Sequence, residues 1–276
     1  MLNPQIHRSL ELSIVIPAHN EAGRIRPYLQ QITDYCERRR RSYEVLVVDD
    51  GSTDETSFIV ERLARIHPTV HLLRLPSCRG KGAAVRYGMQ SAVGCVQLFA
   101  DADGATPIEE LPRLEKALAD GADMAIGSRA LAARLPDFIV HARVYRSVLG
   151  SLFNAAVRQG GIKGISDTQC GFKLFRRIVA QELFGYASID GFGFDLELLY
   201  LAQQRGYRIA EVPVNWSDQP GSKVRVLRDG LAMLRELAVI RRNYLRGRYR
   251  RPSFSPELLP PGRKPVQNAR IVAFSR

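Results

Sequence analysis

The chain has 276 residues, 45% of them hydrophobic, which is enough to bury the core of one large α/β domain. The four cysteines form no CxxC pair and have no histidine at metal-ligand spacing, which argues against a disulfide framework and a zinc site. We find no signal-peptide segment and no apolar run long enough to cross a bilayer, so we expect a cytoplasmic protein, soluble or peripheral to a membrane.

Positive charge is concentrated at the C-terminal end. The formal net charge is +12; residues 1–219 hold 26 Lys and Arg against 25 Asp and Glu, whereas residues 220–276 hold 14 against 3. This distribution indicates an anionic partner at that end, either a membrane surface, a nucleic acid or a phosphorylated ligand. We do not expect a nucleic-acid partner, because no RNA- or DNA-binding motif is present and aromatic residues are not interleaved with the basic ones.

Short apolar runs alternate with segments of helical period, which predicts an α/β fold with a mostly parallel sheet covered by helices on both faces. The predicted strands are residues 12–16, 44–48, 70–75, 96–100, 124–127 and 209–215. The predicted helices are residues 21–40, a helix starting in the capping sequence at 53–56, and residues 82–93, 144–158 and 194–204, with a glycine turn at 160–161.

Residues 224–244 predict an amphipathic helix with a leucine-rich face and several arginines. Such a helix can lie on an anionic membrane, or it can pack on the domain with a solvated basic face, and the sequence leaves both open. Beyond it, residues 252–265 hold five prolines and show no periodicity, which predicts a poorly ordered tail.

Polar residues follow three of the predicted strands, at the edge where an open α/β sheet binds ligands. They are residues 17–21, 49–52 and 101–104. Each segment alone also fits an ordinary turn with no ligand. Because the carboxyl ends of parallel strands meet at one edge, the three segments together predict a single site.

Asp101 and Asp103 are two residues apart at a strand end, so a turn can bring both carboxylates toward one point. Their charges repel unless a cation lies between them, and hard carboxylate oxygens suit Mg²⁺ or Mn²⁺. Such an ion can bind the diphosphate of a nucleoside diphosphate donor and stabilise its developing charge. The same spacing also arises by chance in surface turns, and it is the position within the three segments that favours a metal site.

The chain resembles the family 2 glycosyltransferases of the GT-A fold. The resemblance is carried, in the family's order, by residues 14–21, 47–54, 101–103 and 127–129, and it covers about residues 10–245. Residues 167–173, 194–198 and 216–224 resemble the dolichyl-phosphate β-glucosyltransferase branch of that family. The eukaryotic enzymes of that branch carry an N-terminal membrane anchor, which this sequence does not show.

The resemblance implies which residues bind the donor. Asp50 would accept a hydrogen bond from a uracil ring nitrogen, and Asp101 and Asp103 would serve the ribose, the metal and the diphosphate. Ala105 stands where a related polyprenyl-phosphate mannosyltransferase pattern has a glutamine, which leaves two carboxylates as the side-chain metal ligands. The donor-binding residues predicted in this way are Pro17, Ala18, Glu21, Asp50 and Asp101, and the pattern around Lys81 adds that residue.

Lys81 lies between Gly80 and Gly82. A P-loop is excluded, since Leu75 stands where its first glycine is required and Gly82 stands at its Ser/Thr position. We expect the two glycines to let the backbone approach the donor, with Lys81 near a phosphate; a simple helix N-terminus explains the same pattern.

Asp195 and Glu197 begin a predicted helix, where the helix dipole keeps carboxylates ionised. Inverting transfer to a hydroxyl needs a general base, whereas a phosphate monoester dianion is already nucleophilic near neutral pH. We assign Asp195 as the site carboxylate in preference to Glu197; alternatively, Asp195 caps the helix and Glu197 is solvated. Together with the residues that the resemblance implies, the catalytic set is Asp195, Asp103 and Arg129. The resemblance also implies an acceptor-phosphate set of Arg129, Arg143, Arg146, Lys223 and Arg225.

The implied function is inverting transfer of a hexose, with glucose and UDP-glucose favoured by the branch, to a polyprenyl or dolichyl phosphate at the cytoplasmic membrane face. A family 2 enzyme acting on a soluble or polysaccharide acceptor is the alternative, and a nucleic-acid-binding protein a remote one. On this interpretation residues 1–222 form the GT-A catalytic domain, residues 223–245 a basic helix at the membrane surface, and residues 246–276 a proline-rich tail.

Overall fold

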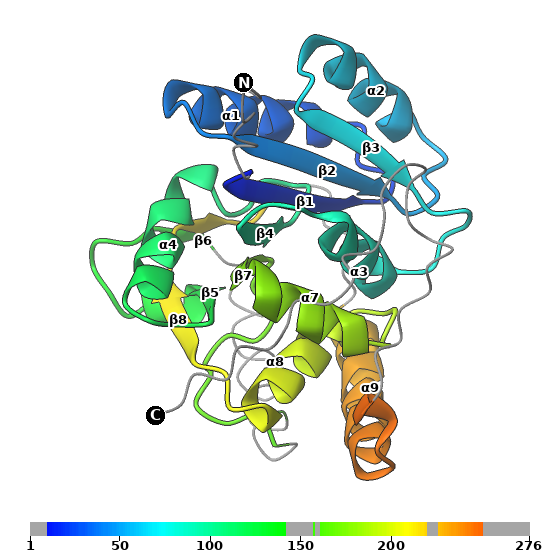
Figure 1. Ribbon diagram of the computed structural model, residues 1–276, viewed down its shortest axis with the longest axis vertical. Helices are drawn as coiled ribbons and strands as arrows, with labels where there is room; N and C mark the ends of the chain where they lie inside the picture. Colours follow the sequence, from blue (N-terminus) through cyan, green and yellow to red (C-terminus); the bar gives the residue numbers. More distant parts are fainter. Residues whose placement is uncertain (1–9, 142–156, 158–160, 220–225, 251–276) are drawn as a thin grey trace, which may run out of the picture.

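The computed structural model describes residues 10–141, 157, 161–219 and 226–250. Seven strands of this part of the chain form one sheet, in the order β3-β2-β1-β4-β7-β5-β8 (Figure 1). The strands are β1 Leu12–Ala18, β2 Tyr43–Asp49, β3 Val70–Arg74, β4 Val96–Ala100, β5 Met124–Ser128, β7 Phe172–Arg176 and β8 Ile209–Pro213. A second, two-stranded sheet pairs β6 Val140–His141 with β9 Trp216–Ser217 in parallel.

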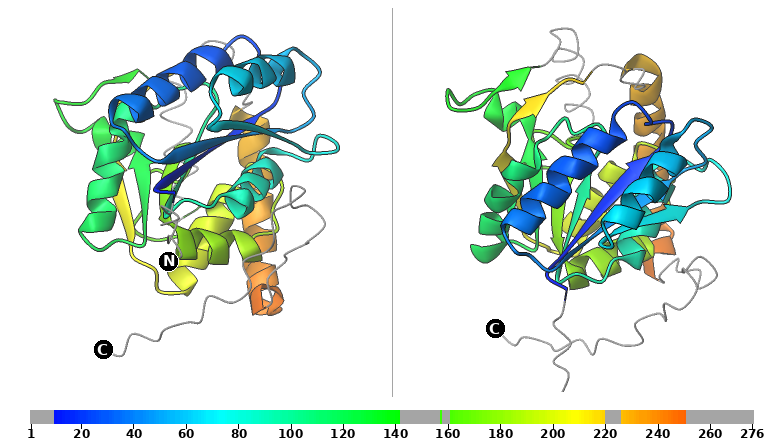
Figure 2. Two further views of the ribbon diagram at one scale, coloured as in Figure 1. Left: turned by 45° about the horizontal axis from the view of Figure 1, so that its top comes forward. Right: turned by 90° about the horizontal axis from the view of Figure 1, so that it is seen from above.

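Helices cover both faces of the large sheet, as the sequence predicts (Figure 2). Strand residues alternate between the two cores: Ile14 and Ile16 of β1 belong to one, and Val15 to the other. The first core is closed by α1 Ile25–Arg38, α2 Thr56–Ile66 and α4 Leu111–Ala119, with the short η1 Ile108–Glu110. The second is closed by α3 Lys81–Ser91, α7 Arg177–Tyr186, α8 Phe194–Gln204 and α9 Val226–Leu245.

The predicted strands are all present, and the predicted mostly parallel α/β fold is confirmed. Strand β7 and the helices α4 and α7 were missed, as was the short α5 Arg129–Ala132. The predicted helix at 144–158 lies outside the described residues apart from Val157, and of the glycine turn only Gly161 is described.

Strand β7 runs antiparallel to both of its neighbours, β4 and β5. Its first residue, Phe172, therefore pairs with Ala100, the last residue of β4. The segment just before β7 consequently arrives at the carboxyl ends of β4 and β5. This is how residues 167–171 reach the edge of the sheet where the site was predicted.

Helix α9 confirms the predicted helix and packs on the domain. Leu237 and Ile240 are buried in the second core, together with Tyr249 of η2 Arg248–Arg250, while Leu231 and Leu245 are exposed. The structure therefore shows that this helix packs on the domain. Its contact with a membrane stays a proposal. Among the described helices, none combines the length and apolarity needed to span a bilayer.

Candidate functional site

A pocket of about 320 Å³ lies at the carboxyl ends of β1, β2 and β4. Its wall includes the predicted donor residues Pro17, Ala18, Glu21, Asp50, Lys81 and Asp101, together with Asp103. The predicted convergence of three strand-end segments on one site is thus what the structure shows. The wall also contains residues that the sequence did not single out as donor contacts, among them Arg24, Cys78, Ala84 and Phe192.

Asp50 is fixed at one end of this pocket by the turn that precedes α3. Its two carboxylate oxygens accept hydrogen bonds from the backbone amides of Arg79 (2.7 Å) and Gly80 (2.8 Å). Oδ2 also accepts from Cys78 Sγ (3.6 Å), and Oδ1 can accept a second donor. Asp50 is therefore held in a fixed orientation and keeps capacity for a hydrogen bond from a ligand, as its predicted role requires.

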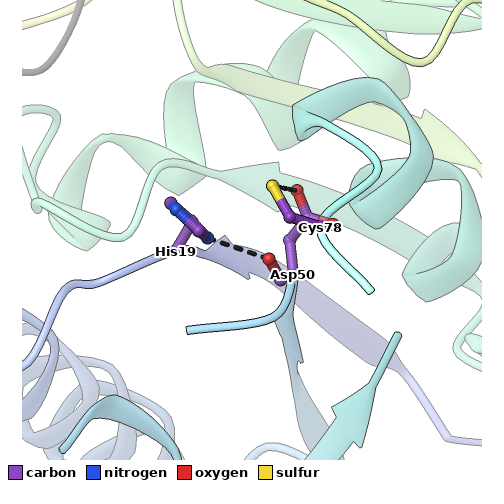
Figure 3. A group of neighbouring side chains, drawn as sticks. All are labelled: His19, Asp50 and Cys78. Carbon is purple, nitrogen blue, oxygen red and sulfur yellow. Dashed lines mark hydrogen bonds between the residues drawn. The ribbon is translucent and has the colours of Figure 1, made fainter. Parts of the chain in front are cut away.

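His19 and Cys78 flank Asp50 (Figure 3). One ligand atom from each of the three residues lies within 4.8 Å of the others, a spacing at which such groups can hold a metal ion. However, His19 Nδ1 lies 2.8 Å from the Asp50 carbonyl oxygen, and the Asp50 carboxylate is already engaged with the two amides. We therefore interpret these three residues as a hydrogen-bonded group that stabilises the turn, and we assign no metal ion to them.

Asp101 and Asp103 follow β4. The Asp101 amide donates to the Gly171 carbonyl (3.0 Å), and its Oδ1 lies 2.6 Å from Lys81 Nζ. Asp103 Oδ1 accepts from the Ala105 amide (3.1 Å), and its Oδ2 lies 3.7 Å from Arg24 Nη1. Two carboxylates and two cations thus face one another at the diphosphate end of the predicted site.

The electrostatics of this group fit a divalent cation. Burial and the neighbouring charge of Asp101 raise the pKa of Asp103, despite the Ala105 amide, Arg24 and Lys81. A hard ion bound by both carboxylates would relieve that repulsion. Ala105 is buried and offers no side-chain ligand, so Asp101 and Asp103 are the two side chains that would hold Mg²⁺ or Mn²⁺.

Lys81 is a cation in this pocket. Burial lowers the pKa of its ammonium, but the charges of Asp101 and Asp195 outweigh burial, and the pKa is raised overall. Lys81 is thereby kept protonated beside the position predicted for a diphosphate.

The two glycines beside Lys81 pack against residues 188–193. A Cβ on Gly80 would lie 2.5 Å from the Asp190 carbonyl oxygen, and one on Gly82 would lie 2.4 Å from the Ile189 carbonyl oxygen. The Gly82 amide donates to the Asp190 carbonyl (2.8 Å). The glycines therefore admit residues 188–193, here called the 188–193 loop, against the start of α3. Gly80 also lines the pocket, and the expected approach of its backbone to the donor stays a prediction.

Arg129 follows β5 and is held by Asp167. Its Nε and Nη2 donate to the two carboxylate oxygens at 2.7 and 2.8 Å, and its guanidinium lies 5.3 Å from the Trp216 ring centroid. Burial opposes the charge on Arg129, but Asp167 raises its pKa and Asp101 adds to the effect. Arg129 is thus a fixed cation at the same edge, outside the pocket wall. The other predicted phosphate ligands, Arg143, Arg146, Lys223 and Arg225, lie outside the described residues.

Asp195 is buried in an ion pair behind Lys81. Its Oδ1 lies 2.6 Å from Nζ of the fully buried Lys173, which also donates to the Cys170 carbonyl (2.6 Å). Burial raises the pKa of Asp195 against the charges of Lys173 and Lys81. Its catalytic role stays a prediction. Lys173 was missed as a site residue, and the signal for it was a lysine among the apolar residues 172–175.

Glu197 is fully buried, so the alternative that it is solvated is wrong. Its carboxylate accepts from the backbone amides of Ser188 and Ile189, both at 2.8 Å, and from Tyr249 Oη at 2.7 Å. Glu197 therefore anchors the first residues of the 188–193 loop.

Comparison with known proteins agrees with this geometry. The family model described as glycosyl transferase family 2 matches residues 13–184. The human dolichyl-phosphate beta-glucosyltransferase is 38% identical over 251 residues, covering 87% of this chain and 78% of that protein. The corresponding Drosophila melanogaster protein is 40% identical over 255 residues, covering 88% and 78%.

Among solved structures, the fold is similar to glucosyl-3-phosphoglycerate synthase from Mycobacterium tuberculosis in complex with Mn²⁺, UDP and phosphoglyceric acid. The TM-score is 0.58 at 21% sequence identity, covering 88% of this chain and 80% of that one. At this identity the likeness shows the GT-A glycosyltransferase architecture.

Proposed function

The chain belongs to glycosyl transferase family 2, and we propose that it transfers glucose from UDP-glucose to dolichyl phosphate or another polyprenyl phosphate, with inversion at the sugar. The observation that carries the proposal is the pocket that unites Asp50, Lys81, Asp101 and Asp103 at one end of the sheet. The names of the relatives support the sugar and the acceptor, and the UDP and Mn²⁺ of the structural neighbour support the donor and the metal.

The donor would lie along this pocket. Pro17, Ala18 and Asp50 line the end where the base binds, with Asp50 accepting from the uracil ring nitrogen. Lys81 and Arg24 provide positive charge near the two aspartates that would hold the ion. When bound there, Mg²⁺ or Mn²⁺ would supply charge stabilisation to the diphosphate. Lys81 adds an ammonium at a site partly shielded from water, where such a charge acts strongly.

The acceptor is proposed to react as a phosphate dianion. One of its oxygens attacks the anomeric carbon, the bond from that carbon to the UDP oxygen breaks, and UDP departs with the electron pair. A dianion needs no general base, because its second pKa is near 6. This agrees with the placement of Asp195, whose carboxylate is paired with Lys173 and whose charge raises the pKa of Lys81. Arg129 at the edge of the site is the described cation that we assign to the acceptor phosphate.

We further propose that the enzyme acts as a peripheral protein at the cytoplasmic membrane face. In support, α9 exposes Leu231 and Leu245 and carries the exposed arginines Arg235, Arg241 and Arg242. Removal of α9 would also take the buried Leu237 and Ile240 out of the second core and expose the apolar residues they cover, so deletion is a poor test. The triple substitution R235E/R241E/R242E should instead abolish binding to vesicles containing anionic lipid without altering the unfolding temperature. Unchanged vesicle binding would contradict the membrane proposal.

The function is tested with purified protein, a panel of UDP- and GDP-sugars, and a polyprenyl phosphate. We expect UDP release to depend on UDP-glucose, polyprenyl phosphate and a divalent ion together, and Asp101→Ala to abolish it. Asp120→Asn, which removes a surface carboxylate paired with Lys116, is the matched control and should be fully active. Release only from GDP-mannose would overturn the donor, and transfer only to a soluble sugar or phosphate would overturn the acceptor.

A further inference from the structure

We propose that Glu236 of α9 is a positioning residue of the donor site, which holds the 188–193 loop in the form that completes the donor pocket. The proposal rests on the proposed function, since it concerns binding of the UDP moiety. It makes the C-terminal helix part of the donor site, in addition to its proposed contact with the membrane.

The contact between Glu236 and the loop is close and directional. Glu236 Oε2 accepts a hydrogen bond from the Gly193 amide at 2.7 Å. A Cβ on Gly193 would lie 2.4 Å from Glu236 Oε2, and one on Gly191 would lie 2.3 Å from Oε1. The loop therefore has glycine at the two positions where its backbone meets this carboxylate. A hydrogen bond to a charged acceptor is among the stronger ones, so the contact constrains the end of the loop.

The same loop forms part of the donor pocket. Phe192, between the two glycines, belongs to the pocket wall although the residue is 36% exposed. On the other side of the loop, the Asp190 carbonyl accepts from the Gly82 amide, and the Asp190 carboxylate pairs with Arg79 and Arg86. Arg79 in turn donates its amide to Asp50. A displacement of the loop would thus reach Phe192, the start of α3 beside Lys81, and the turn that holds Asp50.

The loop is held at both ends by acidic side chains from outside it. Glu197 of α8 fixes Ser188 and Ile189, and Glu236 of α9 fixes Gly193. Helices α8 and α9 lie side by side (Figure 1), and Tyr249, which follows α9, donates to Glu197. Without Glu236, the loop would lose the anchor next to Phe192 while keeping the one at its start. We therefore expect loss of Glu236 to loosen the pocket wall and leave the core intact.

The test compares E236A, which removes the acceptor, with E236Q, whose amide oxygen can still accept from the Gly193 amide. We expect E236A to raise the dissociation constant of UDP and the KM for UDP-glucose about tenfold, the effect of losing one charge-assisted hydrogen bond. E236Q should stay within about threefold of wild type, because it keeps a neutral version of that bond. The value of kcat at saturating donor should change little in both. E61A, which removes a surface carboxylate paired with Arg74, is the control and should match wild type.

Three results would overturn the proposal. If E236A binds UDP as tightly as wild type, Glu236 does not position the donor site. If the substitution lowers only the unfolding temperature and kcat and leaves the KM for UDP-glucose unchanged, Glu236 has a structural role alone. Equal damage in E236A and E236Q would also contradict the hydrogen-bond argument. Calorimetric titration of wild type with UDP separates this failure from failure of the proposed function, because in the latter case wild type itself does not bind UDP.

Discussion

Gly171 packs directly against the carboxylate of Asp101, so that a Cβ added at this glycine would lie 1.9 Å from Asp101 Oδ2. The Asp101 amide also donates to the Gly171 carbonyl. The antiparallel strand β7 brings Gly171 to the end of β4, and the absence of a side chain there leaves room for the carboxylate. The geometry of the predicted metal site therefore depends on a residue that does not line the pocket.

We predict that Gly171→Ala displaces the Asp101 carboxylate and lowers kcat about 100-fold, the size of effect that a shift near 1 Å can have on a positioned group. Mn²⁺ affinity, followed by calorimetry in the presence of UDP, should weaken in parallel. Gly230→Ala is the control, since a Cβ there meets nothing within 4 Å. A G171A enzyme with wild-type kcat would show that Asp101 does not need its present position.

The raised pKa of Asp103 predicts a pH-dependent effect of Asp103→Asn on stability. Burial and the charge of Asp101 favour the protonated carboxyl in the folded protein. The stabilisation from that protonated form is complete below the ordinary pKa of aspartate and is lost as the pH rises through the raised pKa. In EDTA, D103N should therefore unfold at the same temperature as wild type at low pH and at a higher temperature at neutral pH.

Metal should reverse that order. Mn²⁺ binds the ionised carboxylate, so saturating Mn²⁺ at neutral pH should stabilise wild type and leave D103N unchanged. Protons compete with Mn²⁺ for Asp103. Because the pKa of Asp103 is raised, the affinity of wild type for Mn²⁺ should begin to fall at a higher pH than it would for an aspartate of ordinary pKa. Thermal unfolding scans with and without Mn²⁺ measure both effects. Equal stabilisation of the two proteins by Mn²⁺ would remove Asp103 from the metal site.

The four thiols should differ in reactivity according to their burial. Cys36 and Cys170 are buried, and burial raises the pKa of each to about 12, whereas Cys78 and Cys95 are exposed. Iodoacetamide at pH 8 should modify Cys95 and Cys78, and leave Cys36 and Cys170 unmodified in the native protein. Because Cys78 lines the pocket, UDP should slow modification of Cys78 and have no effect on Cys95. Peptide mass spectrometry reads each site; equal rates at Cys78 with and without UDP would place the nucleotide elsewhere.

The sequence predicted the parts of the site that depend on local pattern. Strands β1 and β2 are buried along their whole lengths, so their apolar runs can be recognised in the sequence. The residues that follow them could therefore be assigned to one edge of the sheet. Strand β7 was missed because Lys173 interrupts its apolar run, although that lysine is buried against a carboxylate. Its antiparallel direction is a property of the whole sheet, with no signal in residues 172–176.

Contacts between distant residues explain the rest of what was missed. The pairing of Asp50 with the Arg79 amide joins positions 29 residues apart, and that of Gly193 with Glu236 joins positions 43 residues apart. Nothing in either local segment marks its partner. The glycines at 80 and 82 were noticed, but whether they face a ligand or the 188–193 loop depended on where that loop lies.

The buried pair of Lys173 and Asp195 gives the last prediction. Lys173 is fully buried and Asp195 is 3% exposed, so neither charge has water as an alternative partner. Lys173→Met leaves the carboxylate buried without its ammonium, and we expect the free energy of unfolding to fall by about 3–5 kcal/mol. The double variant K173M/D195L replaces both charges with apolar groups of similar size and should recover most of that loss.

Activity should not follow stability in this series. The charge of Asp195 raises the pKa of Lys81, and the double variant removes that charge from beside the donor pocket. K173M/D195L should therefore unfold at urea concentrations close to wild type and still turn over UDP-glucose more slowly, with the deficit growing as the pH rises and Lys81 loses its proton more readily. Urea titrations and kcat profiles against pH measure the two properties separately. Full recovery of both would show that the pair serves the fold alone, whereas stable K173M would mean that Asp195 is protonated when its partner is absent.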